Sequence, residues 1–574
     1  MRKFAGTALA AASVAVALAS GAMRGAVAAD IPVKAPVYKA TQVTSPSWTG
    51  FYFGVGLGFR ADDTNARLSA ATQSGPGFTN DLLACLANIA CSNGVSPTPT
   101  SFRVSPYVGY NWQLSPLWLV GVEADRGWAG KTATFGGMTF PATAFVDGFA
   151  ASTFATRTTW DASLRGRVGF LVNPAVLLYA TAGVAWQHVE EISSCAPGTC
   201  APGGVGPAFL SQSANKAGAT VGAGIEGLLW GNWIARAEYR YADFGHVSFA
   251  DLRTCPAAFC GIDIRQSTVT DLSLKTHTAT FGLAYKLGDP VNPAVSAYAS
   301  ASPLPAAPAW TGVYLGAGAG LRATDASVNV LSAVFNPVGL PPINETIFCG
   351  MLCPTGAPFG SAAFRGDVFL GYNFQVAPQW ILGAEGDLGL ARRTATYAFG
   401  YYPGANFLAG RDGSSFDLRT TWDASARVRF GYLATPSMLL YLTTGPAWQH
   451  VETSSNCSTA INPNAGPFAQ CAPGGGLNRL TPPVLAHSDT RTGWTIGAGA
   501  EYLLTSNWLV RGEYRYADYG SVSFTDVRTC AAPCAAFAFA GGNESVVYDV
   551  HLRTHTATFA LAYKFGDSPI AAKY

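Results

Sequence analysis

Side chains in this chain alternate between two kinds along segments of about ten residues, and the charges fall on the side with the small residues. In Thr276–Leu287, Thr, Gly and Lys alternate with His, Ala, Phe, Leu and Tyr. A β-strand turns successive side chains to opposite faces, so each such segment has one small polar face and one large apolar face. A soluble sandwich would bury the apolar face and expose the charged one. The opposite arrangement is typical of a membrane-spanning β-barrel, whose apolar face meets lipid.

Composition excludes several other classes. Only 12% of the residues are charged, against roughly 25% in an average soluble protein. The net charge of +2 provides no basic field for nucleic acid. Beyond the N-terminal segment, no apolar run reaches the length of about 18 residues that a spanning helix needs.

The N-terminus has the pattern of a secretory signal. Arg2 and Lys3 precede an uncharged stretch rich in Ala, Val and Leu, and small residues precede Asp30. This pattern predicts a cleaved signal peptide over residues 1–29, followed by a periplasmic segment over 30–47. We therefore expect a protein that crosses the inner membrane and resides in the cell outer membrane.

The rest of the chain is an internal repeat. Arg157–Ser163 is identical to Arg419–Ser425, an offset of 262 residues that grows to 275 and then to 278 toward the end of the second copy. The extra residues fall in segments rich in Gly, Pro and Cys. The repeat predicts one domain over 48–287, a Pro/Ala-rich linker over 288–308, a second domain over 309–566 and a tail over 567–574.

Each copy contains eight alternating segments. In the first copy they cover roughly 51–60, 102–113, 117–130, 157–171, 175–190, 216–229, 233–241 and 276–287. Short turns alternate with long connections, which cover roughly 61–101, 131–156, 191–215 and 247–273. In outer-membrane barrels the short turns face the periplasm and the long loops face outside.

Four tryptophans each follow a short turn by a few residues and lie on the apolar face: Trp118, Trp233, Trp380 and Trp508. We interpret them as part of an aromatic girdle at the periplasmic boundary of the membrane. The fold prediction is all-β, with two tandem eight-stranded antiparallel barrels. One sixteen-stranded barrel is the alternative, and a linker of about twenty residues, far longer than a hairpin needs, favours two closed barrels.

Charged side chains lie on the inward face of both copies. The candidate interior network is Glu123, Asp125, Arg165, Arg167, Arg236, Glu238 and Arg240, with Glu385, Asp387, Arg427, Arg429, Arg511, Glu513 and Arg515 in the second copy. Asp161, Glu226, Asp423 and Glu501 share this face. In an eight-stranded barrel such groups would neutralise one another in a filled interior, whereas in a sixteen-stranded ring they would line an aqueous channel.

Twelve cysteines fall into six close pairs, all in segments read as long loops. The disulfide candidates are Cys85, Cys91, Cys195, Cys200, Cys255, Cys260, Cys349, Cys353, Cys457, Cys471, Cys530 and Cys534. An even number of cysteines in an exported protein predicts disulfides, and pairing between nearest neighbours is the simplest pattern. Metal binding is the rival interpretation, but Cys-x-x-Cys spacing and nearby His ligands are missing, so no metal site is expected.

Four sequence motifs resemble a known family. They are D-x-P-V-K-A-P from Asp30, S-W-T-G-F-Y-F-G from Ser47, E-Y-R-Y-A-D from Glu238 and T-A-T-F-G-L-A-Y-K from Thr278. Together they resemble the small outer-membrane β-barrel proteins of alphaproteobacteria, relatives of OmpA-type barrels in the porin family. Members of that family are usually single barrels, so this chain resembles a tandem duplication of one.

The expected function is structural or surface-interacting, with long disulfide-pinned loops outside the cell. Passive diffusion of small solutes through a porin is one alternative, and loop-mediated binding of haemin or of a host surface is another. The recurring histidines His188, His450, His277 and His555 point outward by parity, so we expect no enzyme and no cofactor. Expected partners are outer-membrane lipid, lipopolysaccharide near Lys275 and Arg553, and the barrel-assembly machinery during insertion. No nucleic acid is expected, and the oligomeric state stays open.

Overall fold

A computed structural model describes twelve stretches of the chain, and everything below concerns these stretches. They are residues 47–74, 99–136, 153–194, 206–229, 231–260, 263–288, 310–344, 357–399, 414–456, 470–471, 479–530 and 541–565. The predicted signal peptide, most of the linker and the predicted tail lie outside them.

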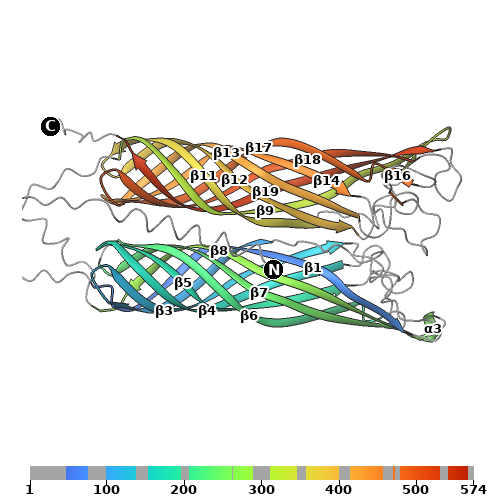
Figure 1. Cartoon of the computed structure of the whole chain (residues 1–574), viewed down its shortest axis with the longest axis horizontal. Coiled ribbons are helices and arrows are strands. Elements are labelled where there is room, and N and C mark those ends of the chain that lie inside the picture. The colour runs from blue at the N-terminus through green and yellow to red at the C-terminus, as the bar shows by residue number, and fades with distance from the viewer. Residues whose placement is uncertain are drawn as a thin grey trace, which may run out of the picture. The chain divides into compact units, whose positions relative to one another are not determined.

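The first copy is a closed antiparallel barrel of eight strands in sequence order (Figure 1). The strands are β1 (Gly50–Ser74), β2 (Thr100–Gln113), β3 (Trp118–Gly136), β4 (Thr153–Asn173), β5 (Val176–Ser194), β6 (Phe209–Leu228), β7 (Trp233–Cys255) and β8 (Ile264–Lys286). The short helix α3 (Ala257–Cys260) lies between β7 and β8. No described helix has the length and apolar character needed to cross a membrane.

The second copy forms its own ring of eight long strands. These are β9 (Gly312–Pro337), β11 (Ala357–Ala377), β12 (Trp380–Phe399), β13 (Ser414–Thr435), β14 (Met438–Asn456), β17 (Val484–Leu503), β18 (Trp508–Cys530) and β19 (Gly542–Lys564). Three short strands extend this sheet: β10 (Ile343–Asn344) beside β9, β16 (Arg479–Thr481) beside β18, and β15 (Gln470–Cys471) beside β16.

The closing pairs decide between the two predicted architectures. In the first copy β1 pairs with β8, with Tyr52 opposite Lys286. In the second copy β9 pairs with β19, with Tyr314 opposite Lys564. Each copy therefore closes on itself, which confirms two eight-stranded barrels and excludes one ring of sixteen strands.

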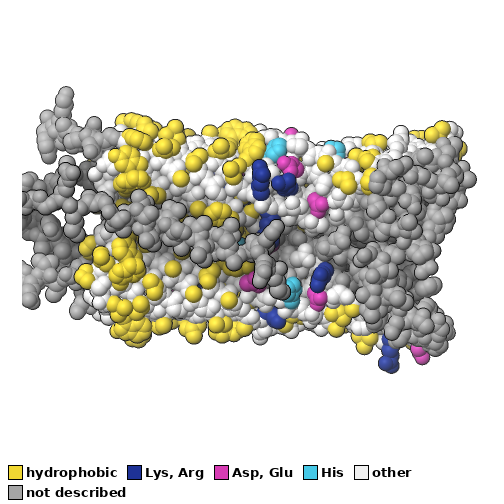
Figure 2. All heavy atoms as spheres, in the orientation of Figure 1, with side chains coloured by type: hydrophobic (Ala, Val, Ile, Leu, Met, Phe, Trp, Pro, Cys, Tyr) yellow, Lys and Arg dark blue, Asp and Glu magenta, His cyan; other side chains and the backbone are white. Residues whose placement is uncertain are grey.

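Both barrels turn their apolar side chains outward. Along β5 buried and accessible residues alternate, and the four tryptophans predicted for the girdle are 36–50% exposed. Figure 2 shows hydrophobic side chains over the half of each barrel near the short turns, with charged and histidine side chains beyond it.

The spacing of two tryptophans on β3 gives the thickness of this apolar band. Trp118 and Trp128 both point outward, each 50% exposed, and they lie ten residues apart on one strand. At about 3.3 Å per residue and a tilt of about 40°, that distance corresponds to roughly 25 Å along the barrel axis. This is the thickness of the apolar band of an outer-membrane barrel. We take the membrane-spanning part as the region between these two levels.

The strands continue far past this band, which corrects the predicted loop boundaries. Residues 61–74 belong to β1 and not to a loop, and the connection predicted over 247–273 is only the segment between Cys255 and Ile264. Beyond the band the outward side chains of β7 are mixed, with Ser248 and Ala250 beside the exposed Leu252. The regular run of large apolar residues therefore ends, although the backbone pairing continues.

Three cysteines that were expected in loops lie at the ends of strands instead. Cys255 ends β7, Cys530 ends β18 and Cys471 ends β15, while Cys260 ends α3. The other eight disulfide candidates lie outside the described residues.

Candidate functional site: the charged interior of each barrel

The polar centre of the first barrel is built by inward side chains that lie two residues apart on three strands, β3, β4 and β7. Glu123 and Asp125 come from β3, Arg165 and Arg167 from β4, and Arg236, Glu238 and Arg240 from β7. Alternation sends all of them inward, and each is at most 8% exposed. Because a buried charge needs a partner, their mutual geometry decides whether the interior is stable.

Glu123 is the centre of the cluster nearer the short turns. Its carboxylate lies 2.5 Å from Arg165 Nη2 and 2.7 Å from Arg236 Nη1, and the Tyr52 hydroxyl donates to it at 2.7 Å. Arg165 also reaches Glu238 at 2.8 Å. One carboxylate is thus held by two guanidinium groups and a phenol.

Further bonds complete this cluster. Arg167 pairs with Glu226 at 2.9 Å, and the Tyr179 hydroxyl donates to Glu238 at 3.0 Å. Tyr179 lies over Gly224, where any Cβ would clash with its ring. A glycine on β6 therefore leaves the room in which this tyrosine reaches the charges.

Asp125 and Asp161 form a second cluster on the extracellular side of the first. Arg103 Nη2 lies 2.6 Å from Asp125 and Arg240 Nη1 lies 2.7 Å from it. Asp161 accepts from Arg60 Nη1 at 2.8 Å and also pairs with Arg103. Arg60 Nε donates to Asp62 at 2.9 Å.

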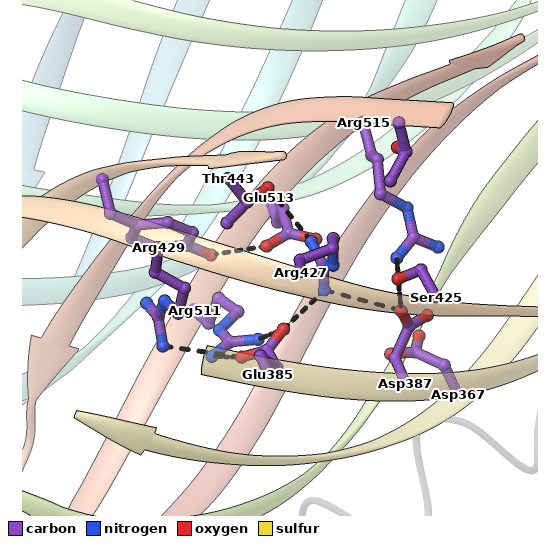
Figure 3. Close-up of polar contacts among 12 residues, drawn as sticks. Asp367, Glu385, Asp387, Ser425, Arg427, Arg429, Thr443, Arg511, Glu513 and Arg515 are labelled. Atoms are coloured by element: carbon purple, nitrogen blue, oxygen red, sulfur yellow. Dashed lines mark hydrogen bonds and ion pairs between the residues drawn. The ribbon is translucent and has the colours of Figure 1, made fainter. Parts of the chain in front are cut away.

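The second barrel repeats this network (Figure 3). Glu385 pairs with Arg511 at 2.6 Å and with Arg427, which also reaches Glu513 at 2.6 Å. Arg429 pairs with Glu501 at 2.6 Å, and Asp387 pairs with Arg515 at 2.6 Å (Figure 3).

Acids and bases balance in each network, although the positions differ. The first barrel has Arg60, Arg103, Arg165, Arg167, Arg236 and Arg240 against Asp62, Glu123, Asp125, Asp161, Glu226 and Glu238. The second has Arg322, Arg365, Arg427, Arg429, Arg511 and Arg515 against Asp367, Glu385, Asp387, Asp423, Glu501 and Glu513. Six bases face six acids in both.

Apolar side chains close the lumen on both sides of the charges. Toward the short turns, Trp48, Leu119, Leu171 and Leu177 pack with the three interior tyrosines, and Trp48 Nε1 donates to the Pro174 carbonyl at 3.1 Å. Trp310 makes the same bond to the Pro436 carbonyl at 3.0 Å in the second barrel. This layer is an apolar floor beneath the network.

On the extracellular side of the first network, buried residues from four strands fill the lumen: Phe154, Val189, Phe244, Leu272 and Leu274. Between the apolar layers, a cavity of about 10 Å³ lies among the charges and is lined by Arg103, Glu123, Asp125 and their neighbours. That volume is about the minimum that holds one water molecule.

A smaller polar layer lies higher still, near the extracellular end of the strands. Asp251 accepts from Gln212 at 2.7 Å and from Ser193, and Arg253 donates to Ser193 at 2.8 Å. Glu191 lies in this layer, beyond the membrane-spanning part of β5. Burial, reinforced by the Asp251 carboxylate, raises the pKa of Glu191 to about 8.

The structure brings all fourteen sequence-derived interior residues into ion pairs within the two barrels. The candidate set lacked other members of the networks, among them Arg103, Asp62, Arg365 and Asp367. The alternation of side chains would have placed these four residues on the inward face. They were missed because they lie at the ends of the predicted strands, or near Pro106, which interrupts the run of large apolar residues on the outward face. Among the described residues, no cluster of His, Cys, Asp and Glu could hold a metal ion.

The outer surface at the extracellular boundary of the apolar band has its own ion pairs. Arg157 pairs with Glu190 at 3.6 Å and Lys275 with Asp243 at 3.8 Å, and Arg553 lies 3.3 Å from Asp518. The His188 ring stacks on Trp160 at 5.8 Å between centroids, and His450 on Trp422 at 5.7 Å. His188 and His450 therefore lie on the outer surfaces of their barrels.

Comparison with known proteins agrees with this geometry. A family model described as the outer membrane protein beta-barrel domain matches residues 8–286 and again 293–565. The chain is 28% identical over 206 residues to the 31 kDa outer-membrane immunogenic protein of Brucella melitensis biotype 1, covering 36% of this chain and 68% of that protein.

Two other relatives have the same character. The 25 kDa outer-membrane immunogenic protein of Brucella abortus biovar 1 is 26% identical over 257 residues, which covers 44% of this chain and 85% of that protein. The 22 kDa outer membrane protein of Rhizobium leguminosarum bv. viciae is 33% identical over 138 residues, covering 24% of this chain and 50% of that protein. Two self-closed barrels and two matches to one family model lead to the same conclusion: the chain belongs to the outer membrane protein beta-barrel domain family and lies in the outer membrane.

Proposed function

We propose that this protein is a non-conducting anchor whose two barrels hold long surface segments at the outside of the outer membrane. The observation that supports this most is the filled interior. In the first barrel an apolar floor and an apolar upper layer enclose twelve mutually paired charges, and a cavity among these charges measures about 10 Å³. The proposed role involves no catalytic step and no cofactor.

The rival role, passive diffusion of small solutes, requires a continuous aqueous path. Eight strands enclose an interior that side chains can fill, whereas general porins use sixteen to eighteen strands. Opening a path through either barrel would require separating buried ion pairs such as Arg165–Glu123, which costs several kcal/mol because each charge would lose its partner. These buried ion pairs support a closed ground state.

Planar-bilayer recording of the purified full chain separates the two roles. We expect no stable conductance steps at moderate voltage, with a general porin in the same bilayer as the positive control. Large and stable steps from the full chain would overturn the anchor role and favour the porin.

We further propose that the six close cysteine pairs stiffen the surface segments. Support comes from the position of Cys255 at the end of β7 and of Cys530 at the end of β18, far past the apolar band on the side away from the short turns. Mass mapping of peptides without reduction should detect six links between near neighbours. Alkylation of the thiols without prior reduction would contradict the proposal.

The lipid partner in this proposal is lipopolysaccharide, and Lys275 and Arg553 are its expected contacts. Both are outward, about half-exposed cations at the extracellular boundary of the apolar band. Replacing both by Ala should lower the amount of lipopolysaccharide that co-purifies with the protein. Unchanged retention would remove these two contacts from the proposal.

A further inference from the structure

One outward cation of the first barrel lies within the apolar band. Arg126 of β3 is exposed, and it lies two residues closer to the short turns than Trp128. Two residues of a tilted strand correspond to roughly 5 Å of depth. The guanidinium group therefore lies just inside the boundary where acyl chains meet headgroups, within reach of the headgroups because arginine side chains extend toward them.

The surroundings of Arg126 are aromatic. Its guanidinium carbon lies 5.6 Å from the Trp128 ring centroid and 5.0 Å from that of Trp160. Trp128 and Trp160 are directly opposite each other on β3 and β4, and Trp160 also carries the stacked His188 ring. The aromatic faces hold the cation in place without neutralising it.

Arg126 differs from the other outward cations of this barrel in its partners. Arg67, Arg157 and Lys275 each lie within 4.0 Å of a carboxylate. For Arg126, the described residues supply only the two tryptophan rings, and the residue opposite it on β4 is Ala162. A guanidinium group at the headgroup level whose donors bond to none of the described residues is suited to bind an anion in two-pronged geometry.

The second barrel provides a natural comparison. With the repeat offset of 262, Leu388 occupies the position of Arg126 and Leu390 that of Trp128, while Trp422 and His450 retain the stacked pair. Both leucines are exposed. The cation is thus a property of the first barrel alone and not a requirement of the fold.

We propose that Arg126, held by Trp128 and Trp160, is a binding site for the phosphate group of a membrane lipid on the first barrel. This deepens the lipid contact in the proposed function by naming a site apart from Lys275 and Arg553. Phosphate is the anion that the outer leaflet supplies at this depth, and arginine matches its geometry. The phosphate of lipid A and that of a phospholipid headgroup share this chemistry.

The test is native mass spectrometry of the full chain in detergent, titrated separately with bisphosphorylated lipid A, dephosphorylated lipid A and phosphatidylglycerol. We expect Arg126→Leu to weaken binding of the phosphorylated lipid about tenfold or more, and Arg126→Lys to retain part of it. The dephosphorylated lipid should bind the wild type and Arg126→Leu equally weakly. Loss confined to lipid A or to phosphatidylglycerol identifies the source of the phosphate.

A matched gain-of-function variant guards against indirect effects. Leu388→Arg together with Leu390→Trp should add a second bound lipid, because these changes build the same site on the second barrel. Arg126→Leu carries the residue that the second barrel already tolerates, so it should insert and fold normally. Equal lipid binding by the wild type and Arg126→Leu would overturn the site, whatever the result at Lys275 and Arg553.

Discussion

Arg365 and Asp367 form an ion pair of 2.9 Å in the second barrel, and this pair replaces the one that Arg60 and Asp62 make in the first. With the repeat offset of 262, Asp62 corresponds to Thr324 and Asp367 corresponds to Ser105. One acid has thus moved from the first strand of the barrel to the next while the central network kept six acids. The requirement on the sequence is neutrality of the buried network, not a carboxylate at one fixed position.

This exchange predicts that the two positions compensate for each other. Asp367→Ser should destabilise the second barrel by about 3–5 kcal/mol, because it leaves the buried Arg365 with one acid too few. Adding Thr324→Asp should recover most of the loss, since the new carboxylate would face Arg322 Nε, a buried donor without an acceptor among the described residues. Urea unfolding of the reconstituted protein measures both variants.

Thr324→Asp alone is the matched control. A seventh acid should destabilise the barrel or be taken up as a proton, so the single variant should be less stable than the double variant at neutral pH. Equal stabilities for the two variants would show that the acids do not share one network.

Glu123 should be among the least replaceable residues of the first barrel. Glu123→Gln removes the charge that faces Arg165 and Arg236 and leaves two buried guanidinium groups competing for Glu238. We expect a loss of about 3–5 kcal/mol in the free energy of unfolding. Glu190→Gln, at a partly exposed pair with Arg157 on the outer surface, should cost less than about 1 kcal/mol. Similar losses for both would contradict the burial of the network.

The stability of the first barrel should fall as the pH rises toward 9, because of Glu191. Its pKa is about 8 in the folded protein, against a reference value of 4.5. An acid whose pKa is raised by folding adds stability below its unfolded pKa, and that contribution is lost as the pH rises through the folded pKa. Glu191→Gln should therefore remove this pH dependence and make the protein more stable than the wild type above pH 8.

Thermal unfolding between pH 5 and 9 checks this expectation. Glu190→Gln again serves as the control, because it alters the neighbouring residue on the outer face of the same strand. If the wild type and Glu191→Gln respond to pH in the same way, Glu191 is ionised at neutral pH and its burial is incomplete.

The fold was predictable from the sequence because the membrane imposes a strict alternation. Phe51, Phe53 and Val55 must face lipid, so their neighbours on the same strand must face inward. The same alternation on the other strands places Glu123 and Arg236 inward without any structure. The repeat and the linker length then favoured two barrels over one.

Two features could not be predicted, each for a physical reason. Past Trp128 the outward side chains of β3 no longer meet lipid. Alternating hydrophobicity therefore no longer indicates a strand in the sequence, although the hydrogen bonding of β3 to β4 continues to Gly136. The partners of each charge depend on strand stagger across the lumen: Arg60 reaches Asp161, about a hundred positions away in sequence. Parity gives the face but not the level at which two inward side chains meet.

The central claim is that each copy is a complete barrel closed by its own first and last strands. The most direct test places a protease site in the linker at 289–308, cleaves the reconstituted full chain and runs it on SDS gels with and without boiling. We expect two compact fragments that each shift in mobility on boiling, since Tyr52–Lys286 and Tyr314–Lys564 pairing stays within its own half. Fragments that stay together until boiled, or that unfold as soon as the linker is cut, would contradict it.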